Sequence, residues 1–306
     1  MNIFNYIGYF FGYIQWAFFE LVNNYGIALI LFTLLIKILF FPMFVKQQKS
    51  LASNSRLVEK QKEIQKKYPN DKQKQNIELT KLYEQEGVNP ASGCLTMFLP
   101  LIILLGVMGA VYNPLQCTLH LESDKVSEAV SLLGTIPGIG STFVSSGGNI
   151  SYGEIGIIKA FPAIRDHLTM FTQAELENIA QFNAGFNFLG LDLLATPKYS
   201  SFKTMVWIIP VLCLLTSIFT TYLTQKNQKA QVAGQGCMKY AIYGMSLFTA
   251  WIAYTVPAAV GLYWLANNVF QIFQTMITNK YYSVEAINAK AEARRIALRE
   301  EDEKIM

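Results

Sequence analysis

The sequence is poor in charged residues and in histidine. Only 15% of its 306 residues are charged and two are histidine, whereas about a quarter of a typical soluble domain is charged. Neither His120 nor His167 belongs to a His-Glu-x-x-His zinc motif, and the sequence contains no Walker loop and no dinucleotide-binding glycine fingerprint. These absences argue against an enzyme, so we expect no catalytic residues, no cofactor and no bound metal.

Cysteine is also scarce. The four cysteines, Cys94, Cys117, Cys213 and Cys237, are far apart in sequence, and no two have the spacing of metal ligands. Of the four, only Cys117 lies in a segment that we expect on the extracytoplasmic side of a membrane, as the charge distribution described below indicates. A disulfide framework is therefore not expected.

Hydrophobic residues are abundant instead. They make up 52% of the sequence, and the mean hydropathy is +0.27. A helix needs about 20 apolar residues to cross a bilayer, and five stretches qualify. The sequence predicts an all-α membrane protein, a bundle of five transmembrane helices with a hydrophilic groove open to the cytoplasm. The predicted spans are residues 25–45, 94–113, 203–224, 238–254 and 257–278, the last two separated by a tight turn at Val256-Pro257.

Charge is distributed unevenly between the loops. Residues 46–93 contain ten Lys or Arg, and Lys226, Lys229 and Lys239 lie in or next to the loop at 225–237 without an acid between them. Residues 114–202 contain eight acidic residues against four basic ones. Because positive loops stay in the cytoplasm, we expect the N-terminus outside and both the basic loops and the C-terminal tail, residues 279–306, inside.

Residues 1–24 are aromatic-rich, with apolar residues recurring at helical spacing. The first basic residue of the chain is Lys37, which does not fit the basic start of a signal peptide. We therefore expect an amphipathic helix lying in the outer membrane interface.

The segment 46–93 is rich in Lys, Gln and Glu, which are good helix formers, and Pro69-Asn70-Asp71 interrupts it. It predicts a helical hairpin standing off the membrane. Two interpretations remain: a solvated connector, or a cationic arm that recruits lipid headgroups, ribosomal RNA or a targeting factor. The candidate contact residues are Lys60, Lys66, Lys67, Tyr68, Lys72 and Tyr83.

The segment 114–202 gives weaker signals. Residues 122–133 predict an amphipathic helix, and Thr172 with Glu175 matches a capping box that opens a helix through Gln181. The apolar run at 186–194 predicts a segment at the membrane interface.

Lys37 stands out because it is the one charge deep within a predicted span. It lies about 18 Å along the helix from Tyr25, where a charge facing lipid costs about 2.5–3.5 kcal/mol, so we expect it to face a polar interior. Candidate lining residues follow helical spacing, although hydrogen bonds between helices are the alternative use for each. The predicted groove residues are Thr33, Lys37, Thr216, Ser217, Thr220, Tyr263, Trp264, Asn267, Gln271 and Gln274.

Several motifs in this order are similar to those of the YidC/Oxa/Alb membrane insertases. They are the apolar span with one basic residue, Lys37, shortly before Pro42; the Lys/Gln-rich hairpin; Gly93-Cys94 at the start of the second span; and the run from Gly261 to Asn268. The resemblance covers all five spans and the hairpin. Departures are lysine where the family usually has arginine, Pro100 where a glutamine is common, and a longer outer loop.

The resemblance implies a bacterial plasma-membrane protein of the small Gram-positive type. It implies an insertase and chaperone that moves nascent membrane proteins into the lipid bilayer through a cationic groove without ATP. Implied partners are the nascent chain, the ribosome or signal-recognition targeting factors, and the Sec translocon. A small-solute transporter and a structural scaffold for membrane complexes are the alternative functions.

Overall fold

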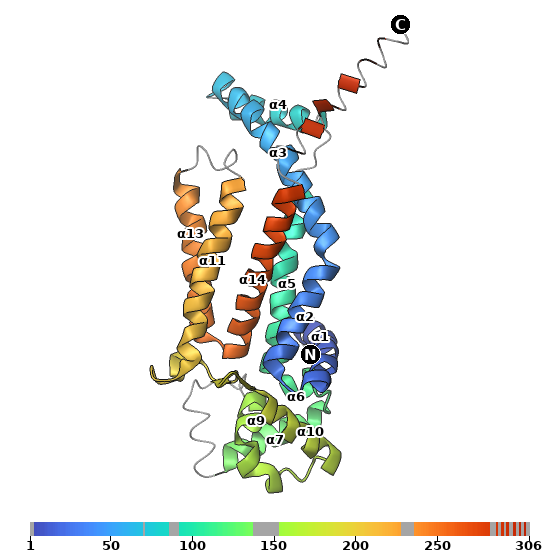
Figure 1. Ribbon diagram of the computed structural model, residues 1–306, viewed down its shortest axis with the longest axis vertical. Helices are drawn as coiled ribbons and strands as arrows, with labels where there is room; N and C mark the ends of the chain where they lie inside the picture. The colour runs from blue at the N-terminus through green and yellow to red at the C-terminus, as the bar shows by residue number, and fades with distance from the viewer. Residues whose placement is uncertain are drawn as a thin grey trace. The chain divides into compact units, whose positions relative to one another are not determined.

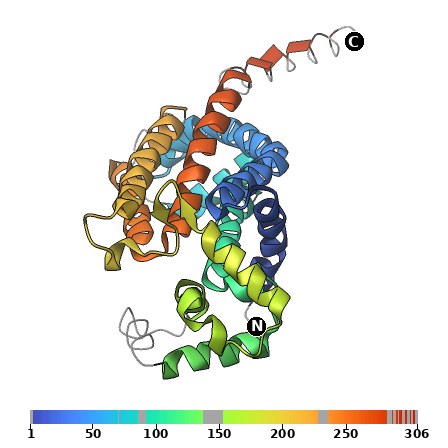
Figure 2. The ribbon, with the colours of Figure 1, turned by 60° about the horizontal axis from the view of Figure 1, so that its bottom comes forward.

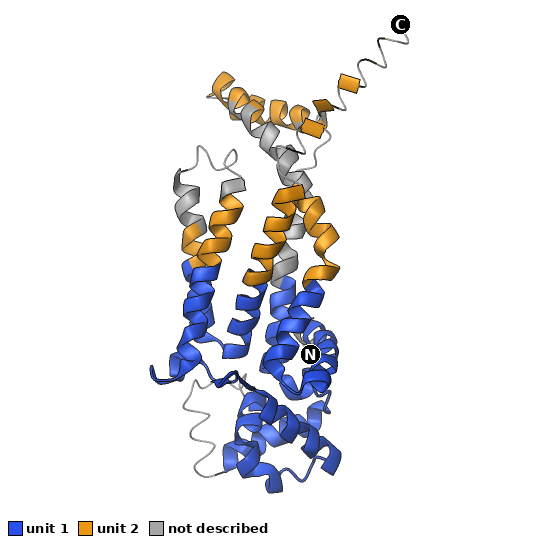
Figure 3. Cartoon of the chain, viewed as in Figure 1, with its two compact units in different colours: residues 1–36, 100–216, 247–268 blue, residues 37–99, 217–246, 269–306 orange. Residues whose placement is uncertain are grey.

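A computed structural model gives the fold. It describes residues 3–69, 71–85, 92–136, 153–227 and 236–281, together with isolated residues in the tail. The chain divides into two compact units, one formed by residues 1–36, 100–216 and 247–268 and the other by residues 37–99, 217–246 and 269–306 (Figure 3). Each unit is described separately.

The described chain is almost entirely helical (Figure 1). Its only sheet in the described residues is a two-stranded antiparallel hairpin that pairs Asn187 with Asp192 and Phe188 with Leu191. The main elements are α1 (Ile3–Val22), α2 (Tyr25–Leu39), α3 (Phe41–Lys67), α4 (Lys72–Gln85), α5 (Ser92–Tyr112), α6 (Pro114–Cys117), α7 (Ser123–Thr135), α9 (Gly153–Ile164), α10 (Gln173–Gly185), β1 (Asn187–Phe188), β2 (Leu191–Asp192), α11 (Ile208–Asn227), α13 (Gly236–Thr255) and α14 (Ala258–Tyr281).

Each predicted span overlaps a long helix, although the third begins a few residues before α11, and α13 and α14 are separated by only two residues, as the predicted turn at Val256-Pro257 requires. Among the described residues, the helix at Met205–Gln225 is long and apolar enough by itself to cross a membrane. A second candidate is the pair Tyr25–Leu39 and Phe41–Gln48, which is bent by 52°. The first predicted span is therefore not straight. Its second part continues directly into the hairpin as α3.

In the first unit, α1 packs closely on α6. A β-carbon at Gly12 would lie 1.7 Å from the carbonyl oxygen of Cys117, so only glycine permits this approach. The rings of α1, α2 and α10 then form an aromatic cluster, in which Phe19 and Phe182 lie 5.1 Å apart and edge-to-face, a favoured ring geometry. The cluster consists of Trp16, Phe19, Tyr25, Phe182 and Phe186.

The described residues within 114–202 form a mainly helical region, here called the loop domain, in which α9 lies against both α7 and α10 (Figure 2). The predicted helix at 122–133 is confirmed as α7, and the predicted capping box is confirmed at the start of α10. The Thr172 hydroxyl accepts from the Glu175 N–H, and the Glu175 carboxylate accepts from the Thr172 N–H. In the predicted interfacial segment 186–194, Phe186, Leu193 and Leu194 are buried whereas Leu189 is 82% exposed, and the position of the segment at a membrane interface stays a prediction.

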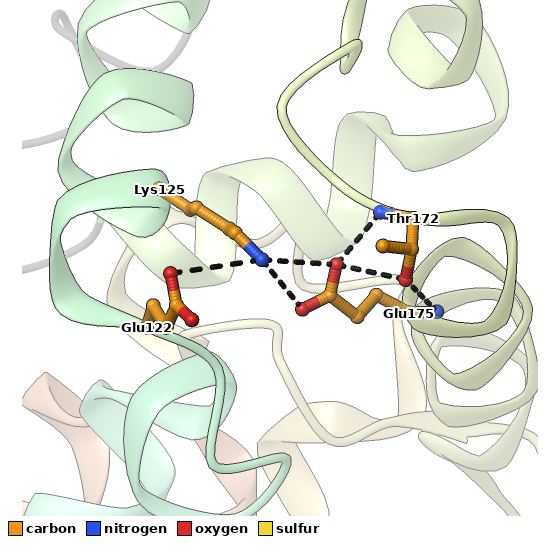
Figure 4. Close-up of polar contacts among 4 residues, drawn as sticks. All are labelled: Glu122, Lys125, Thr172 and Glu175. Atoms are coloured by element: carbon orange, nitrogen blue, oxygen red, sulfur yellow. Dashed lines mark hydrogen bonds and ion pairs between the residues drawn. The ribbon is translucent and has the colours of Figure 1, made fainter.

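One lysine joins two helices of the loop domain. Lys125 Nζ on α7 lies 3.1 Å from Glu175 Oε1 on α10 and 3.7 Å from Glu122 Oε2 (Figure 4). Glu175 thus accepts hydrogen bonds from both its own helix cap and α7. Although partial burial opposes it, these hydrogen bonds lower the pKa of Glu175.

A second carboxylate is buried in the loop domain. Glu154, in the first turn of α9, is 5% exposed and accepts from the backbone N–H groups of Leu115 at 2.8 Å and Gln116 at 3.1 Å. These are free donors at the start of α6. Burial raises the pKa of Glu154 to about 7, although the two N–H donors act in the opposite direction.

Cys117 and Cys213 are buried and form no disulfide among the described residues, and burial raises the pKa of Cys117 to about 12. The side chains of Cys94 and Cys237 lie outside the described ones.

In the second unit, α3 and α4 form a hairpin around Tyr68. Asp71 accepts from the Lys74 N–H at 2.9 Å and so caps α4. Lys67 and Lys74 place their ammonium groups 5.5 and 5.8 Å from the centre of the Tyr68 ring, a cation–π distance.

Candidate functional site

Lys37 lies in the last turn of α2, just before the bend. The helix ends at Leu39, Phe40 has φ −92° and ψ 4°, and α3 begins with Pro42 in its first turn. Proline has no N–H to donate, so it starts a new helix more readily than it continues an old one. A lysine in the last turn also interacts favourably with the carbonyl end of a helix dipole. The bend therefore places the cation at a helix C-terminus.

The partner of Lys37 is a neutral amide. Its Nζ donates to Oε1 of Gln271 at 2.8 Å, and the amide nitrogen of Gln271 lies 3.5 Å from the Thr275 hydroxyl. Within the described part of the chain, no carboxylate forms an ion pair with Lys37. We call Lys37, Gln271 and Thr275 the Lys37 cluster. Among the described residues, the printed partner of its ammonium group is thus an amide and not a carboxylate.

Further polar residues follow Gln271 along α14, and we call them together the polar stripe. Gln274, Thr275 and Thr278 are all buried, with exposed fractions of 7%, 2% and 1%. The Thr278 hydroxyl donates to the carbonyl groups of Gln274 and Thr275, so it is satisfied within its own helix. Gln274 is thus buried beside Thr275 and Thr278 on α14, and its place in a hydrophilic groove stays a prediction.

Two further predicted residues of the second unit lie on α11. Ser217 is buried, and the Thr220 carbonyl accepts from the hydroxyl of Thr224 at 2.9 Å. Thr221 and Ser246 join α11 to α13, since their hydroxyl oxygens lie 3.3 Å apart. Sequence reasoning overlooked α13. The three-residue spacing of Ser246 and Thr249, both buried, could have indicated a polar face there.

The remaining predicted groove residues belong to the first unit. Thr33 is buried, and its hydroxyl donates to the Leu29 carbonyl one turn earlier at 2.7 Å. Thr216 accepts from Asn268 Nδ2 at 3.2 Å, which joins α11 to α14. Trp264 packs against an apolar cluster formed by Val206, Ile209, Cys213, Ala253 and Ala258.

Asn268, which was not among the predicted groove residues, thus makes the contact with α11. Tyr263 is 5% exposed and its neighbour Asn267 is half-buried.

The predicted hairpin contacts are mostly exposed. Lys66, Lys67 and Lys72 are exposed, Tyr68 is half-buried between its two lysines, and the side chain of Tyr83 lies outside those described. Lys60 is exposed as well. Among its described side chains, the hairpin thus exposes several cations together with the apolar Ile77, which is 52% exposed.

These features are those of a helical membrane protein with a lysine near the end of an apolar helix and buried polar residues along its last long helix. Comparison with known proteins specifies the family. Residues 17–286 match the family described as 60Kd inner membrane protein, and the chain belongs to this family, the YidC/Oxa family of membrane insertases.

Three curated relatives share the name membrane protein insertase YidC. The one from Caldanaerobacter subterraneus subsp. tengcongensis is 29% identical over 84% of this chain and 85% of the relative. The one from Treponema denticola is 26% identical over 88% of this chain but 36% of the relative. The one from Oceanobacillus iheyensis is 26% identical over 84% of this chain and 75% of the relative.

Proposed function

We propose that this chain is a membrane protein insertase that uses the Lys37 cluster to receive the polar end of a nascent membrane segment. The observation that supports this most is the 2.8 Å hydrogen bond from Lys37 to a neutral glutamine. A charge within an apolar span is costly, and such residues mark functional sites by default. A lysine paired with a carboxylate would be neutralised, whereas one held by an amide keeps its charge available for a substrate.

The mechanism follows from desolvation. The short external segment of a single-span substrate is polar and often acidic, and moving it into hydrocarbon without a partner costs several kcal/mol. A cationic, polar site part-way through the membrane lowers that cost. The free energy comes from burial of the substrate's apolar helix in lipid, at about 25 cal/mol per Å², so the step needs no ATP.

We propose the orientation that the loop charges favour, with the loop domain outside and the α3–α4 hairpin in the cytoplasm. The exposed lysines of the hairpin, Lys66, Lys67 and Lys72, would then meet the ribosome, a targeting factor or anionic headgroups. The Sec translocon is a further candidate partner. Deletion of residues 57–84 should reduce substrate recruitment while the helices of the first unit stay folded, and loss of that fold would instead indicate a structural role.

The decisive experiment is insertion of a single-span substrate with an acidic external tail into liposomes that contain the purified full chain. Lys37→Glu should lower insertion more than tenfold because it replaces attraction by repulsion. Lys37→Ala, which removes the attraction, should lower insertion more than tenfold as well. Lys37→Arg should stay within twofold of the wild type, since it keeps the charge. Lys280→Glu, an equal charge reversal at an exposed position of α14, is the matched control.

Wild-type activity of Lys37→Glu would overturn the electrostatic role. Photo-crosslinking from position 37 then distinguishes the classes of protein. An insertase should crosslink there to the nascent chain, whereas a small-solute transporter and a scaffold should not.

A further inference from the structure

The first turn of α14 is hydrogen-bonded to a segment far away in sequence. The first N–H groups of a helix have no partner within it. Here the Ala258 N–H donates to the Ala195 carbonyl and the Ala259 N–H donates to the Leu193 carbonyl, both at 2.8 Å. We call residues 187–195, which comprise the β-hairpin and the three residues after it, the strap. The strap thus supplies the acceptors that the start of α14 lacks.

The same strap also binds the start of α2. Asn24 Nδ2 donates to the Asn187 carbonyl at 2.8 Å, while Asn24 Oδ1 accepts from the Ile27 N–H at 3.1 Å and caps α2. The approach is close, because a β-carbon at Gly26 would lie 2.5 Å from Cγ of Phe188. One amide side chain therefore caps α2 and joins it to the strap.

Short-range hydrogen bonds stiffen the strap itself. Asp192 Oδ1 accepts from the Leu194 N–H at 2.9 Å. The Asp192 carbonyl accepts from the Ala195 N–H at 3.1 Å, and the Leu193 N–H donates to the Phe186 carbonyl at 3.0 Å. Leu193 is fully buried, whereas the Asp192 side chain is 54% exposed and lies 3.5 Å from Lys159. The two carbonyl groups that accept from α14 are thus held in fixed directions.

The two helices joined by the strap are the ones that carry the Lys37 cluster. Lys37 is the thirteenth residue of α2 and Gln271 the fourteenth residue of α14, counted from Tyr25 and Ala258. At 1.5 Å per residue, each lies about 18–20 Å along its helix from the strapped end. A strap that fixes both starts therefore fixes the axial register in which an amine on one helix meets an amide on the other.

We propose that the strap is a positioning element for insertion, and that Asn24 and Asp192 are positioning residues that set the register of α2 and α14. This rests on the proposed insertase function. Neither residue contacts the substrate. Both act by keeping Lys37 and Gln271 opposite one another, and loosening the strap lets the two helices slide.

The test uses two matched pairs of variants in the full chain. Asn24→Asp keeps the cap on α2 but loses the N–H donor to Asn187, whereas Asn24→Ala loses both. Asp192→Ala loses the acceptor for Leu194, whereas Asp192→Asn keeps it and removes only the charge opposite Lys159. Hydrogen exchange of the Ala258 and Ala259 amides, measured in lipid nanodiscs, reports directly whether the strap has opened.

Insertion is then measured in a double-mutant cycle with Gln271→Leu. We expect Asn24→Asp and Asp192→Ala to slow insertion about threefold in the wild-type background and less than 1.5-fold in the Gln271→Leu background, because the register matters only while Gln271 holds Lys37. Asp192→Asn should retain wild-type insertion. Exchange at Ala258 and Ala259 should rise at least tenfold in Asp192→Ala.

Equal slowing in both backgrounds would overturn the proposal and leave the strap a purely structural element. Faster exchange with unchanged insertion would overturn it as well. If Asp192→Ala leaves the Ala258 and Ala259 amides protected from exchange, a glycine is inserted after Asp192, which displaces both carbonyl groups by one residue. The proposal then fails if this variant slows insertion equally in both backgrounds, or if exchange rises while insertion is unchanged. Activity of Lys37→Glu tests the insertase function separately, so failure of the strap and failure of the function are distinguishable.

Discussion

The aromatic cluster and the Lys37 cluster are both built on α2, yet they are built differently. In the aromatic cluster, Phe19, Tyr25 and Phe182 are fully buried and each ring contacts at least two others. Lys37 has one neutral hydrogen-bond partner, and Ile38 and Leu39 next to it are each 65% exposed. The first arrangement fixes the position of a helix end, whereas the second leaves a polar group available for a ligand.

The comparison suggests that the two clusters have different roles, which we call a division of labour: the aromatic cluster stabilises the fold and the Lys37 cluster serves insertion. Dense ring packing stabilises the fold because each fully buried aromatic side chain contributes several kcal/mol. A single hydrogen bond between membrane helices contributes only about 0.6 kcal/mol on average. Substitutions in the aromatic cluster should therefore act on stability, and substitutions in the Lys37 cluster should act on insertion.

The largest effect on stability is expected for Phe182→Ala. This ring contacts Trp16, Phe19, Tyr25 and Phe186, so its removal leaves a cavity at the centre of the cluster. We expect a loss of about 3–5 kcal/mol, measured as the opening free energy of α10 by hydrogen exchange. Leu189→Ala, at a side chain that is 82% exposed, is the control and should change it by less than about 0.5 kcal/mol. A similar change in the opening free energy for both variants would contradict the proposal that the aromatic cluster stabilises the fold.

A second prediction concerns the pH dependence of the loop domain. A carboxyl group whose folded-state pKa is raised contributes stability that is fully present below its unfolded pKa, near 4.5, and is lost as the pH rises through about 7. Because each pKa unit corresponds to about 1.4 kcal/mol, Glu154 should make the domain roughly 3 kcal/mol less stable at pH 7.5 than at pH 4.

Glu154→Gln removes the ionisable group but keeps an oxygen acceptor for the N–H groups of Leu115 and Gln116. It should therefore flatten this part of the pH profile, measured as the midpoint of thermal unfolding from pH 4 to pH 8. Glu177→Gln, an exposed carboxylate on α10, is the matched control and should leave the profile unchanged. An unchanged profile in Glu154→Gln would exclude Glu154 as its source.

Local sequence signals predicted α7 and α10 of the loop domain but neither α9 nor the hairpin. Thr172 and Glu175 satisfy one another within a single turn, so four residues of sequence suffice to predict that helix start. The hairpin has strands of only two residues, and the N–H groups that bond the carbonyls of Leu193 and Ala195 come from α14, distant in sequence. A run of apolar residues in the sequence does not by itself distinguish burial within the protein from contact with lipid.

The candidate site was predictable to a similar extent. Lys37 and Gln271 could be predicted because a charge and an amide are unusual in apolar helices. The bend at Phe40 and the Thr221–Ser246 contact could not, since both depend on how neighbouring helices pack. Short polar side chains also bond their own helix, as Thr33 does, so helical spacing does not by itself show which of them reach a neighbour.

A smaller effect is expected at the capping box of α10. Thr172→Ala removes the acceptor for the Glu175 N–H and should cost about 1 kcal/mol. Thr172→Ser keeps a hydroxyl at the same place and should cost less than half of that. Hydrogen exchange of the first turn of α10 measures both, and equal losses would show that the methyl group rather than the cap matters.

The smallest effect, and the sharpest probe of the contrast, is expected for Gln271→Leu. This change removes the amide that holds Lys37 but leaves its charge in place. One interhelical hydrogen bond of about 0.6 kcal/mol corresponds to about a threefold change, so insertion should slow about threefold, far less than in Lys37→Glu, while the unfolding midpoint stays within about 1 °C. Phe273→Ala, at a ring on α14 that is 58% exposed, controls for changes to the helix surface. A large drop in the unfolding midpoint with normal insertion would show that the Lys37–Gln271 bond stabilises the fold, and the division of labour between the two clusters would fail.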